Sequence, residues 1–346
     1  MTAAPPASGR GTALHPVPVT ARTTWLLVRQ GPGWGELSDI PEEEAARILA
    51  SGAPLHSGFA GRTVAGGLAT AAADAAARAA GRPLADWLAD RTAGTVHRRT
   101  LPLYANINRA VRTRNPDAAA AVAARAVAAG FGTVKIAPWD ALTGPDRIAE
   151  GLRIARAVRD AIGEDRRLLL DAHHLLTVDE LLVHADALAE LRPGWLEDTA
   201  QLHDPQGLRK VRDALGVPLA GGEFAATEDE VLPALRSGAL DVLMPDVKHA
   251  GGPQQVLRLA GLAERHGVAV SLHNPSGPVA TAASAHLSAL LAPSSPPLEF
   301  MFGEVAWRAE TVTPHEPVAA GTYTLPPGPG LGLVPDLSHR PEETTA

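Results

Sequence analysis

Short apolar segments that each end at or beside an ionisable residue recur at nearly constant intervals along this chain. These residues are Asp171, Glu197, Glu223, Asp246, His273 and Glu299. Their spacing of 23 to 27 positions is about the length of one strand, one helix and two loops, since a βαβ unit takes roughly 30 residues. The run Leu168–Leu170 has no polar face, which is typical of a parallel strand covered on both sides. The series therefore predicts parallel strands that each bring one ionisable group to a common face.

Two further strands are expected before this series, at Leu101–Asn106 and Thr133–Ala137. Helices are expected between the strands, near 117–129, 144–162, 177–191, 205–215, 227–237, 253–266 and 277–291. Eight strands connected in this way predict a (β/α)8 barrel of the TIM type, in which side chains from several strand ends converge on one mouth.

The predicted organisation places this barrel between two segments of a smaller α+β domain. A strand at Thr23–Arg29, a hairpin partner at Trp34–Leu37, a loop at Ser51–Thr63 and a long alanine-rich helix at Val64–Ala80 form its first part. The expected division is a disordered tail at 1–16, the N-terminal part of the small domain at 17–98, the barrel at 99–307, a C-terminal return to the small domain at 308–338, and a tail at 339–346.

The overall composition excludes several classes of protein. The 346 residues contain no cysteine and carry a formal charge of −7, which argues against disulfides, thiolate metal sites and nucleic-acid binding. No apolar stretch approaches the roughly 18 residues needed to cross a bilayer, and none resembles a signal peptide. We therefore expect a cytoplasmic protein with no membrane partner.

Three of the carboxylates, Asp171, Glu197 and Glu223, follow successive predicted strands. Three carboxylates that meet at one mouth repel one another unless a cation joins them, and oxygen ligands select a hard ion, Mg²⁺ first. The alternative is that each acid only caps the helix that follows its strand.

Several motifs together resemble the enolase superfamily. They are Leu170-Asp171-Ala172-His173, Trp195-Leu196-Glu197-Asp198, Gly221-Gly222-Glu223, Pro245-Asp246 with Gly251-Gly252, His273-Asn274-Pro275-Ser276-Gly277-Pro278 and the late Pro329-Gly330-Leu331-Gly332. The pairing of Asp246 with His273 is similar to the mandelate racemase branch. The resemblance implies a modified (β/α)8 barrel, with a capping domain built from both termini.

The resemblance also implies roles for individual residues. Asp171, Glu197 and Glu223 would be ligands of Mg²⁺, and His273, oriented by Asp246, would remove the proton α to a substrate carboxylate. Lys135 would neutralise that carboxylate. Glu299 would donate a hydrogen bond to the enolate, a role that requires a raised pKa.

His173 has a counterpart in the acid-sugar dehydratases of this superfamily. It would be the general acid that protonates a departing β-hydroxyl group, although a loop contact is an alternative because His174 is adjacent. Alternatives exist for two further residues: Lys135 could form only a surface ion pair, and Glu299 could only cap the barrel floor or pair with Lys135.

One departure from the family pattern bears on the reaction. The mandelate racemase branch usually carries Lys-x-Lys, but this chain has Lys135-Ile136-Ala137, so the opposing second base is missing. We therefore expect a Mg²⁺-dependent lyase that dehydrates a small hydroxylated carboxylate, in a homo-oligomer. A racemase, epimerase or cycloisomerase that uses the same enolate is the first alternative, and a non-catalytic binding protein on this scaffold is the second.

Some polar residues outside the motifs are candidates for substrate selection. Trp34, His56 and Arg62 lie in segments expected to close over the mouth, and Tyr104, Asn106, Asn108 and Arg109 lie near the end of the first barrel strand.

Overall fold

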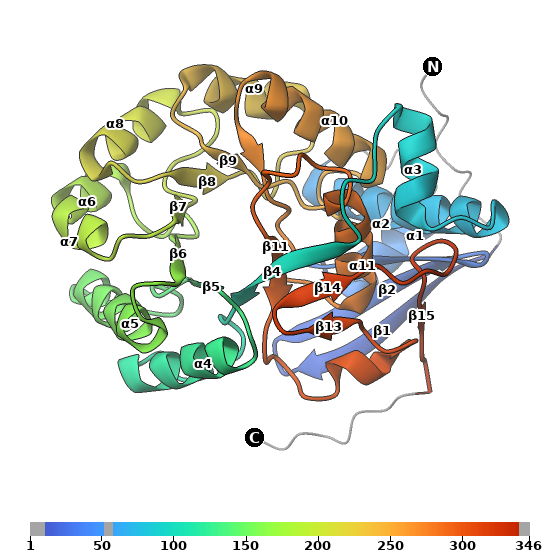
Figure 1. Ribbon diagram of the computed structural model, residues 1–346, viewed down its shortest axis with the longest axis horizontal. Helices are drawn as coiled ribbons and strands as arrows, with labels where there is room; N and C mark the ends of the chain where they lie inside the picture. Colours follow the sequence, from blue (N-terminus) through green and yellow to red (C-terminus); the bar gives the residue numbers. More distant parts are fainter. Residues whose placement is uncertain (1–10, 52–57, 339–346) are drawn as a thin grey trace.

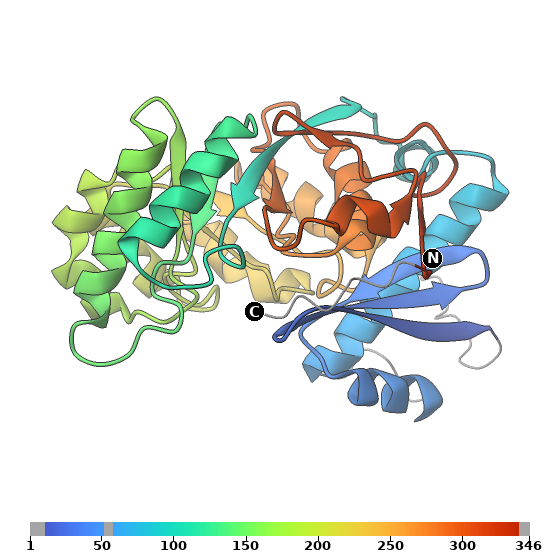
Figure 2. The ribbon, with the colours of Figure 1, turned by 90° about the horizontal axis from the view of Figure 1, so that it is seen from below.

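The computed structural model describes residues 11–51 and 58–338. It contains a barrel and, against one side of it, a smaller α+β part formed by the N-terminal segment (Figures 1 and 2). The exact division into domains stays a prediction. Among the described residues, no helix combines the length and apolarity of a membrane span.

Eight parallel strands form the barrel. They are β4 (Thr100–Asn106), β5 (Thr133–Ile136), β6 (Arg167–Asp171), β7 (Trp195–Glu197), β8 (Leu219–Gly221), β9 (Val242–Leu243), β10 (Ala269–Val270) and β11 (Leu298–Met301). Each pairs with the next from β4 to β10, and β11 pairs with β4. Between β10 and β11, side-chain contacts join the strands: Ser271 Oγ donates to the Pro297 carbonyl at 2.8 Å, and the Asn274 N–H donates to Glu299 Oε2 at 2.7 Å. The predicted barrel is confirmed.

The helices between these strands cover the outside of the barrel. They are α4 (Pro116–Ala128), α5 (Arg147–Ile162), α6 (Val178–Val183), α7 (Ala185–Glu190), α8 (Pro205–Leu215), α9 (Glu228–Ser237), α10 (Pro253–Arg265) and α11 (Pro278–Ser288). The helix expected at 177–191 is divided in two at His184, whose φ of −105° and ψ of 15° are not helical. In the described residues after β11, up to 338, the one helical segment is the 3₁₀ helix η1 (Arg308–Thr311), so the barrel is modified at its last unit.

The smaller α+β part, called the cap below, begins with an antiparallel sheet of three strands. They are β1 (Thr12–Thr20), β2 (Thr23–Gln30) and β3 (Gly33–Leu37). The helices α1 (Glu42–Ser51), α2 (Gly58–Ala79) and α3 (Leu84–Thr92) follow. Helix α2 packs closely on β3 because both carry glycine at the contact: a Cβ atom on Gly35 would lie 2.0 Å from the Gly67 carbonyl oxygen.

Two expectations about the cap were wrong. Residues 12–16, expected in a disordered tail, form the first half of β1, because Leu14 pairs with Val28 and so joins the sheet. The expected loop at 51–63 is already helical from Gly58, and Arg62 lies in α2. Residues 52–57, including His56, lie outside the described residues.

The C-terminal segment was only partly predicted. Strand β14 (Thr322–Thr324) forms a hairpin with β13 (Val318–Ala319) and pairs with the barrel strand β4, whereas it was expected to return to the small domain. Further on, β15 (Val334–Pro335) pairs with β12 (Val312–Thr313). The stretch between β14 and β15 does reach the cap.

Two backbone contacts join that stretch to the cap helices. The Leu84 N–H donates to the Gly330 carbonyl at 2.7 Å, and the Leu331 N–H donates to Asp74 Oδ1 at 2.7 Å. Asp74 is a buried residue of α2.

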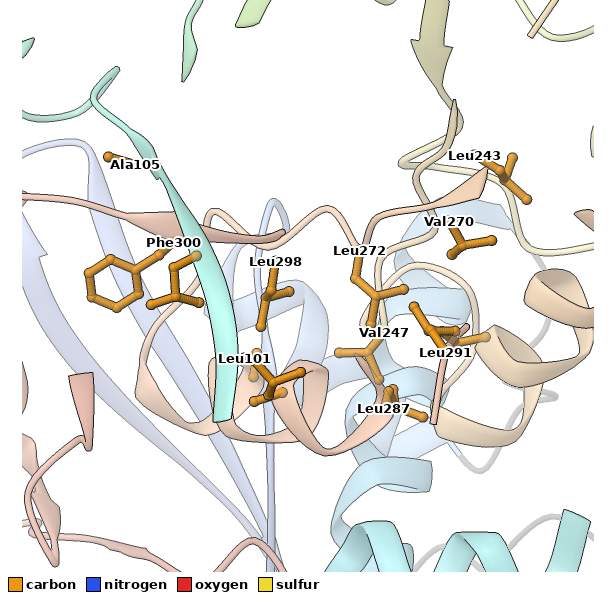
Figure 3. Packing of buried hydrophobic residues seen from close by; sticks show 14 of the residues in the cluster. Leu101, Ala105, Leu243, Val247, Val270, Leu272, Leu287, Leu291, Leu298 and Phe300 are labelled. Atoms are coloured by element: carbon orange, nitrogen blue, oxygen red, sulfur yellow. The ribbon is translucent and has the colours of Figure 1, made fainter. Parts of the chain in front are cut away.

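Along the barrel strands, successive side chains belong in turn to one of two apolar layers, an outer one and an inner one. Leu168 and Leu170 belong to the outer layer between the strands and the helices, part of which Figure 3 shows around Leu272 and Leu287. Leu169 belongs to a smaller interior cluster with Tyr104 and Trp195. Successive residues of a strand point to opposite faces, so this alternation decides which polar residues enter the barrel.

Candidate active site

Successive side chains of β6 point alternately outward and inward, and this alternation places Asp171 inside the barrel. Asp171 is two residues beyond Leu169, which lies in the interior cluster, and Asp171 itself is fully buried. The same period of two carries Glu197 to the interior beyond Trp195, and the two acids pair directly in the parallel register. The end of β6 and the end of β7 therefore place two carboxylates side by side.

Lys135 of β5 lies at the centre of this acidic group. Its Nζ atom is 2.5 Å from Glu197 Oε1, 2.9 Å from Asp171 Oδ2 and 3.3 Å from Glu299 Oε1. Burial alone would lower the pKa of Lys135, but the charges of the three carboxylates raise it well above its ordinary value. Lys135 is therefore an ammonium ion, and the alternative of a surface ion pair is wrong.

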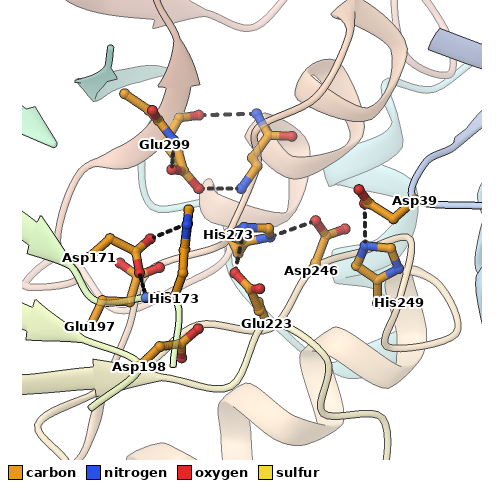
Figure 4. A network of polar contacts seen from close by, with 12 residues as sticks. Asp39, Asp171, His173, Glu197, Asp198, Glu223, Asp246, His249, His273 and Glu299 are labelled. Atoms are coloured by element: carbon orange, nitrogen blue, oxygen red, sulfur yellow. Dashed lines mark hydrogen bonds and ion pairs between the residues drawn. The ribbon is translucent and has the colours of Figure 1, made fainter. Parts of the chain in front are cut away.

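His273 lies on the other side of the ring, three residues beyond β10. Its Nδ1 atom is 2.9 Å from Asp246 Oδ2, and its Nε2 atom is 2.8 Å from Glu223 Oε2 (Figure 4). Asp246 is also bound by Lys248, whose Nζ atom lies 2.7 Å from the same oxygen. The predicted pair of Asp246 and His273 is thus present, with Lys248 as a third member.

His173 contacts two carboxylates at once. Its Nε2 atom is 3.0 Å from Asp171 Oδ2, and its Nδ1 atom is 2.7 Å from Asp140 Oδ1. Burial alone would lower the pKa of His173, but the two carboxylates raise it to about 11. The adjacent His174 lies 3.6 Å from Asp198 and is less closely bound.

Glu299 differs from its predicted role. Its Oε1 atom accepts a hydrogen bond from Asn106 at 2.7 Å, and its Oε2 atom accepts one from the Asn274 backbone at 2.7 Å. Burial would raise the pKa of Glu299, but Lys135 and His273 and these hydrogen bonds lower it. The expected raised pKa is therefore wrong: Glu299 is an ionised acceptor that holds Lys135 and the junction of β10 with β11.

Some of these groups border a cavity of about 410 Å³ at the mouth of the barrel, whereas Asp171, Glu197, Asp246 and Glu299 are not part of its lining. Its lining includes the predicted Lys135, His173, Glu223 and His273, and also Asn106, Asn108 and Arg109. Tyr104 lies below, in the interior cluster. From the cap, Asp39 lines the cavity, whereas Trp34 is buried in β3 and Arg62 pairs with Glu230 at 2.7 Å.

The donor set of the site fits a hard divalent cation. Six buried carboxylates lie around the cavity, and the buried lysines among them are Lys135 and Lys248, with the imidazoles of His173 and His273 as further partners. The carboxylates are Asp171, Glu197, Asp198, Glu223, Asp246 and Glu299. Asp171 Oδ2 and Glu223 Oε2 are buried and lie close to cationic groups, but neither accepts a hydrogen bond of acceptable geometry. Burial and the neighbouring carboxylates raise the pKa of Glu197 and of Asp198.

The three predicted ligands do not already surround a common point. Among the described residues, no three His, Asp or Glu side chains are arranged to hold a metal ion. Lys135 lies between Asp171 and Glu197, and His273 covers Glu223. The oxygen donors therefore suit Mg²⁺ in kind, and these side chains would have to exchange their present cationic partners for the ion.

Two functional candidates were missed from the sequence. Asp140 follows β5 by four residues and reaches His173, and Lys248 follows Asp246 by two and binds it. The only available signal was the position of Asp140 beyond a predicted strand end, where loop geometry decides the direction of a side chain.

The chain is similar to proteins of known activity. The family model described as Enolase C-terminal domain-like matches residues 117–339. Over 195 residues the chain is 34% identical to the D-galactarolactone cycloisomerase of Agrobacterium fabrum, covering 54% of this chain and 51% of that protein. Over 287 residues it is 30% identical to the D-gluconate dehydratase of Thermoproteus tenax, covering 81% and 56%. The chain thus spans about half the length of these curated relatives.

Solved structures support the same fold. A mandelate racemase/muconate lactonizing enzyme from a Jannaschia species has a TM-score of 0.81 at 23% identity, covering 94% of each chain. A member of the enolase superfamily from Salmonella Typhimurium has a TM-score of 0.78 at 20% identity, covering 94% of this chain and 96% of that one. Since the family model spans well over half of the sequence, the chain belongs to the enolase C-terminal domain-like family.

Proposed function

We propose that this protein is a Mg²⁺-dependent dehydratase of small hydroxylated carboxylic acids of the acid-sugar type. The observation that carries the proposal is the placement of two imidazoles on one cavity. His173 follows β6 and His273 follows β10, and these strands are four places apart in a ring of eight. The site therefore has a proton-transfer group on each side of a bound substrate.

The first step assigned to the chain is removal of the proton next to the substrate carboxylate. Burial alone would lower the pKa of His273, but Glu223 and Asp246 raise it well above its ordinary value, so His273 must first lose a proton to act as the base. In the neutral form, Nδ1–H is donated to Asp246 and Nε2 is presented to the cavity, where it now meets Glu223. The proton moves to Nε2, and the electron pair of the C–H bond moves into the carboxylate as an enolate. The ammonium group of Lys135, which lines the cavity, would neutralise a substrate carboxylate oxygen.

The second step is loss of the β-hydroxyl group. The enolate collapses: the carboxylate C=O bond re-forms, the electron pair of the enolate C=C bond forms a new C=C bond between the α- and β-carbons, and the β-carbon–oxygen bond breaks. The leaving oxygen takes a proton from Nε2 of His173 and departs as water. The enol product tautomerises to a 2-keto-3-deoxy acid. Mg²⁺ held by Asp171, Glu197 and Glu223 would supply positive charge to the carboxylate oxygens as the enolate forms.

The relatives support this class of reaction. D-gluconate dehydratase and the D-xylonate dehydratase of Haloferax volcanii, 31% identical over 188 residues, are named for loss of water from sugar acids. A screen of acid sugars for 2-keto acid formation, with Mg²⁺ and with EDTA, tests the proposal. Metal-dependent product from at least one acid supports it; no product from the library together with no solvent exchange of any α-proton contradicts it.

A cycloisomerase is the second candidate, because the relative with 34% identity is named for that activity. The enolate would then be the same, but the product would keep the mass of its substrate, so mass spectrometry separates the two reactions. Ala137 in place of a second lysine argues against a two-base racemase. A binding protein without catalysis would show ligand binding but no α-proton exchange. We also propose a homo-oligomer, which analytical ultracentrifugation tests.

A further inference from the structure

We infer that Asp140 is the positioning residue for His173, and that the two form a second imidazole–carboxylate dyad that serves departure of the β-hydroxyl group. This inference rests on the proposed dehydratase function and adds to it a residue outside the predicted site.

The contacts of His173 repeat those of His273. In each imidazole, Nδ1 contacts an aspartate, at 2.7 Å to Asp140 and 2.9 Å to Asp246. In each, Nε2 contacts a carboxylate of the proposed metal site, at 3.0 Å to Asp171 and 2.8 Å to Glu223. The two histidines thus present the same nitrogen to the cavity.

Each aspartate is also bound by a basic side chain of its own. Lys248 Nζ lies 2.7 Å from Asp246 Oδ2, and Arg114 Nη2 lies 3.3 Å from Asp140 Oδ2. In both dyads, the aspartate and the histidine come from loops after adjacent strands, β5 and β6 in one case and β9 and β10 in the other. A chance contact between two loops would not explain why the same arrangement occurs in both dyads.

The loop that carries Asp140 is firmly packed. Its neighbour Trp139 is buried beneath α5, where Gly151 leaves room for the indole: a Cβ atom on Gly151 would lie 2.3 Å from the ring. The Ala137 N–H donates to Asn108 Oδ1 at 2.6 Å. Asp140 therefore projects from a fixed turn toward His173.

The backbone of His173 is held in an unusual conformation that faces this turn. Its φ angle is +43°, in the left-handed region that residues other than glycine rarely adopt. The His173 N–H donates to Asp171 Oδ1 at 2.9 Å, and the following N–H, that of His174, donates to the Asp198 carbonyl at 3.2 Å. The backbone thus fixes the position from which the His173 side chain extends, and the contact with Asp140 fixes the orientation of its imidazole ring.

The consequence concerns which nitrogen reaches the substrate. An imidazole whose Nδ1–H is donated to Asp140 has only Nε2 available to deliver a proton to the leaving oxygen. Without Asp140 the ring can rotate or change tautomer, so departure of hydroxide slows. Proton removal by His273 does not depend on this contact and should continue.

The test compares Asp140→Ala with the isosteric Asp140→Asn, using an acid that the unaltered protein dehydrates. We expect D140A to lose about 10- to 100-fold in dehydration, the range seen when a carboxylate that orients a metal-ligating imidazole is removed. Exchange of the α-proton with D₂O, followed by NMR, should stay near its original rate. D140N keeps an acceptor oxygen and should retain more activity than D140A.

An analogue with fluorine at the β-carbon gives a sharper readout. Fluoride leaves with its electron pair and needs no proton, so D140A should release fluoride at close to the rate of the unaltered protein. A matched control is Asp241→Asn, which removes a similarly exposed aspartate–arginine pair, with Arg212, from the loop before β9. This control should leave both reactions unchanged.

The outcomes separate this inference from the proposed function. If the unaltered protein neither exchanges α-protons nor dehydrates any acid, the proposed function fails. If it dehydrates an acid but D140A matches it, the positioning role fails alone. Equal losses of dehydration, fluoride release and exchange in D140A, with unchanged circular dichroism, also overturn it, because Asp140 would then act on the whole site.

Discussion

The Nζ atom of Lys135 lies 2.5 Å from Oε1 of Glu197, so the side chain proposed to meet substrate is bound to one proposed to hold metal. Both are fully buried. Neither side chain can be altered without changing the charge balance of the other, and this coupling leads to the first prediction.

Replacing Lys135 with methionine should destabilise the metal-free protein. The change leaves Asp171, Glu197 and Glu299 without their shared cation, and breaking a buried ion pair from one side costs about 3–5 kcal/mol. Urea unfolding without Mg²⁺ measures the loss. Excess Mg²⁺ should stabilise K135M more than the unaltered protein; equal effects of Mg²⁺ on the two would show that the ion does not share these carboxylates.

Mg²⁺ itself should bind and stabilise the unaltered protein. A ligand present at a hundred times its Kd raises the free energy of unfolding by about 2.7 kcal/mol, which a thermal unfolding series with and without EDTA detects. Titration calorimetry should show binding that Glu197→Gln removes. The control is Glu190→Gln, in an exposed pair with Arg156; a loss of binding in this control would point to nonspecific association.

Replacing His273 with asparagine should abolish both α-proton exchange and product formation. The imidazole is the proposed base, and general acid–base groups contribute roughly 10²- to 10⁴-fold. NMR in D₂O and a 2-keto acid assay measure the two quantities. Persistence of exchange in H273N would mean that another group removes the proton. His266→Asn, at the end of α10, should have no effect.

His173→Asn should separate the two reactions that H273N removes together. Exchange of the α-proton should continue, because His273 and Asp246 are intact, while dehydration should fall by roughly 10²- to 10⁴-fold. The same two assays apply. If neither quantity changes in H173N, the general-acid role assigned to His173 is wrong.

His286 should make stability depend on pH below neutrality. This buried residue accepts a hydrogen bond at Nδ1 from the Ala85 N–H at 3.1 Å, and its Nε2 lies 3.2 Å from the Leu331 carbonyl oxygen. Burial lowers its pKa from 6.5 to about 4. The neutral form is therefore favoured by folding, and this contribution is complete above pH 6.5.

As the pH falls from 6.5 toward 4, His286 becomes protonated in the unfolded chain but stays neutral in the folded chain. The contribution of His286, roughly 3 kcal/mol, is lost over that window. Urea midpoints at pH 7, 5.5 and 4.5 should fall less steeply in His286→Gln than in the unaltered protein. Parallel slopes in the two proteins would contradict the assignment.

Gly151→Ala should destabilise the protein, although alanine usually favours a helix. The added Cβ atom would meet the Trp139 indole at 2.3 Å, and overpacking of this kind costs about 1–3 kcal/mol. Urea unfolding measures the effect. Gly261→Ala in α10 is the control, because its Cβ would meet only the end of a flexible arginine at 3.6 Å, and it should be neutral or stabilising.

Much of this architecture was predictable because it depends on period and spacing. The alternation around Leu169 sends Asp171 inward, and the interval between strands brings Glu197 beside it. By contrast, the path of a loop beyond a strand end has no period, so the contact of Asp140 with His173 could not be predicted from its position. The lowered pKa of Glu299 was missed because it depends on groups that the closure of the ring brings together: Lys135 and His273 first, then the hydrogen bonds from the Asn274 backbone and Asn106.

The cap posed a different difficulty. Residues 12–16 of β1 have the sequence Thr-Ala-Leu-His-Pro, which carries no clear strand pattern, and they join the sheet through pairing with β2. Pairing between segments of this kind cannot be recognised from the local sequence pattern of either one. The same applies to β14, whose partner β4 lies more than two hundred residues earlier.

The contact between cap and barrel at Glu36 limits how this protein can be re-engineered. Glu36 of β3 accepts the Gly277 N–H at 2.6 Å and the Ala280 N–H at 2.9 Å, and a Cβ atom on Gly277 would lie 2.7 Å from the Trp25 ring. The loop that begins at His273 is therefore anchored to the N-terminal sheet. A chimera that exchanges caps must carry matching residues at both of these sheet positions, or it will displace His273, the proposed base, along with the cap.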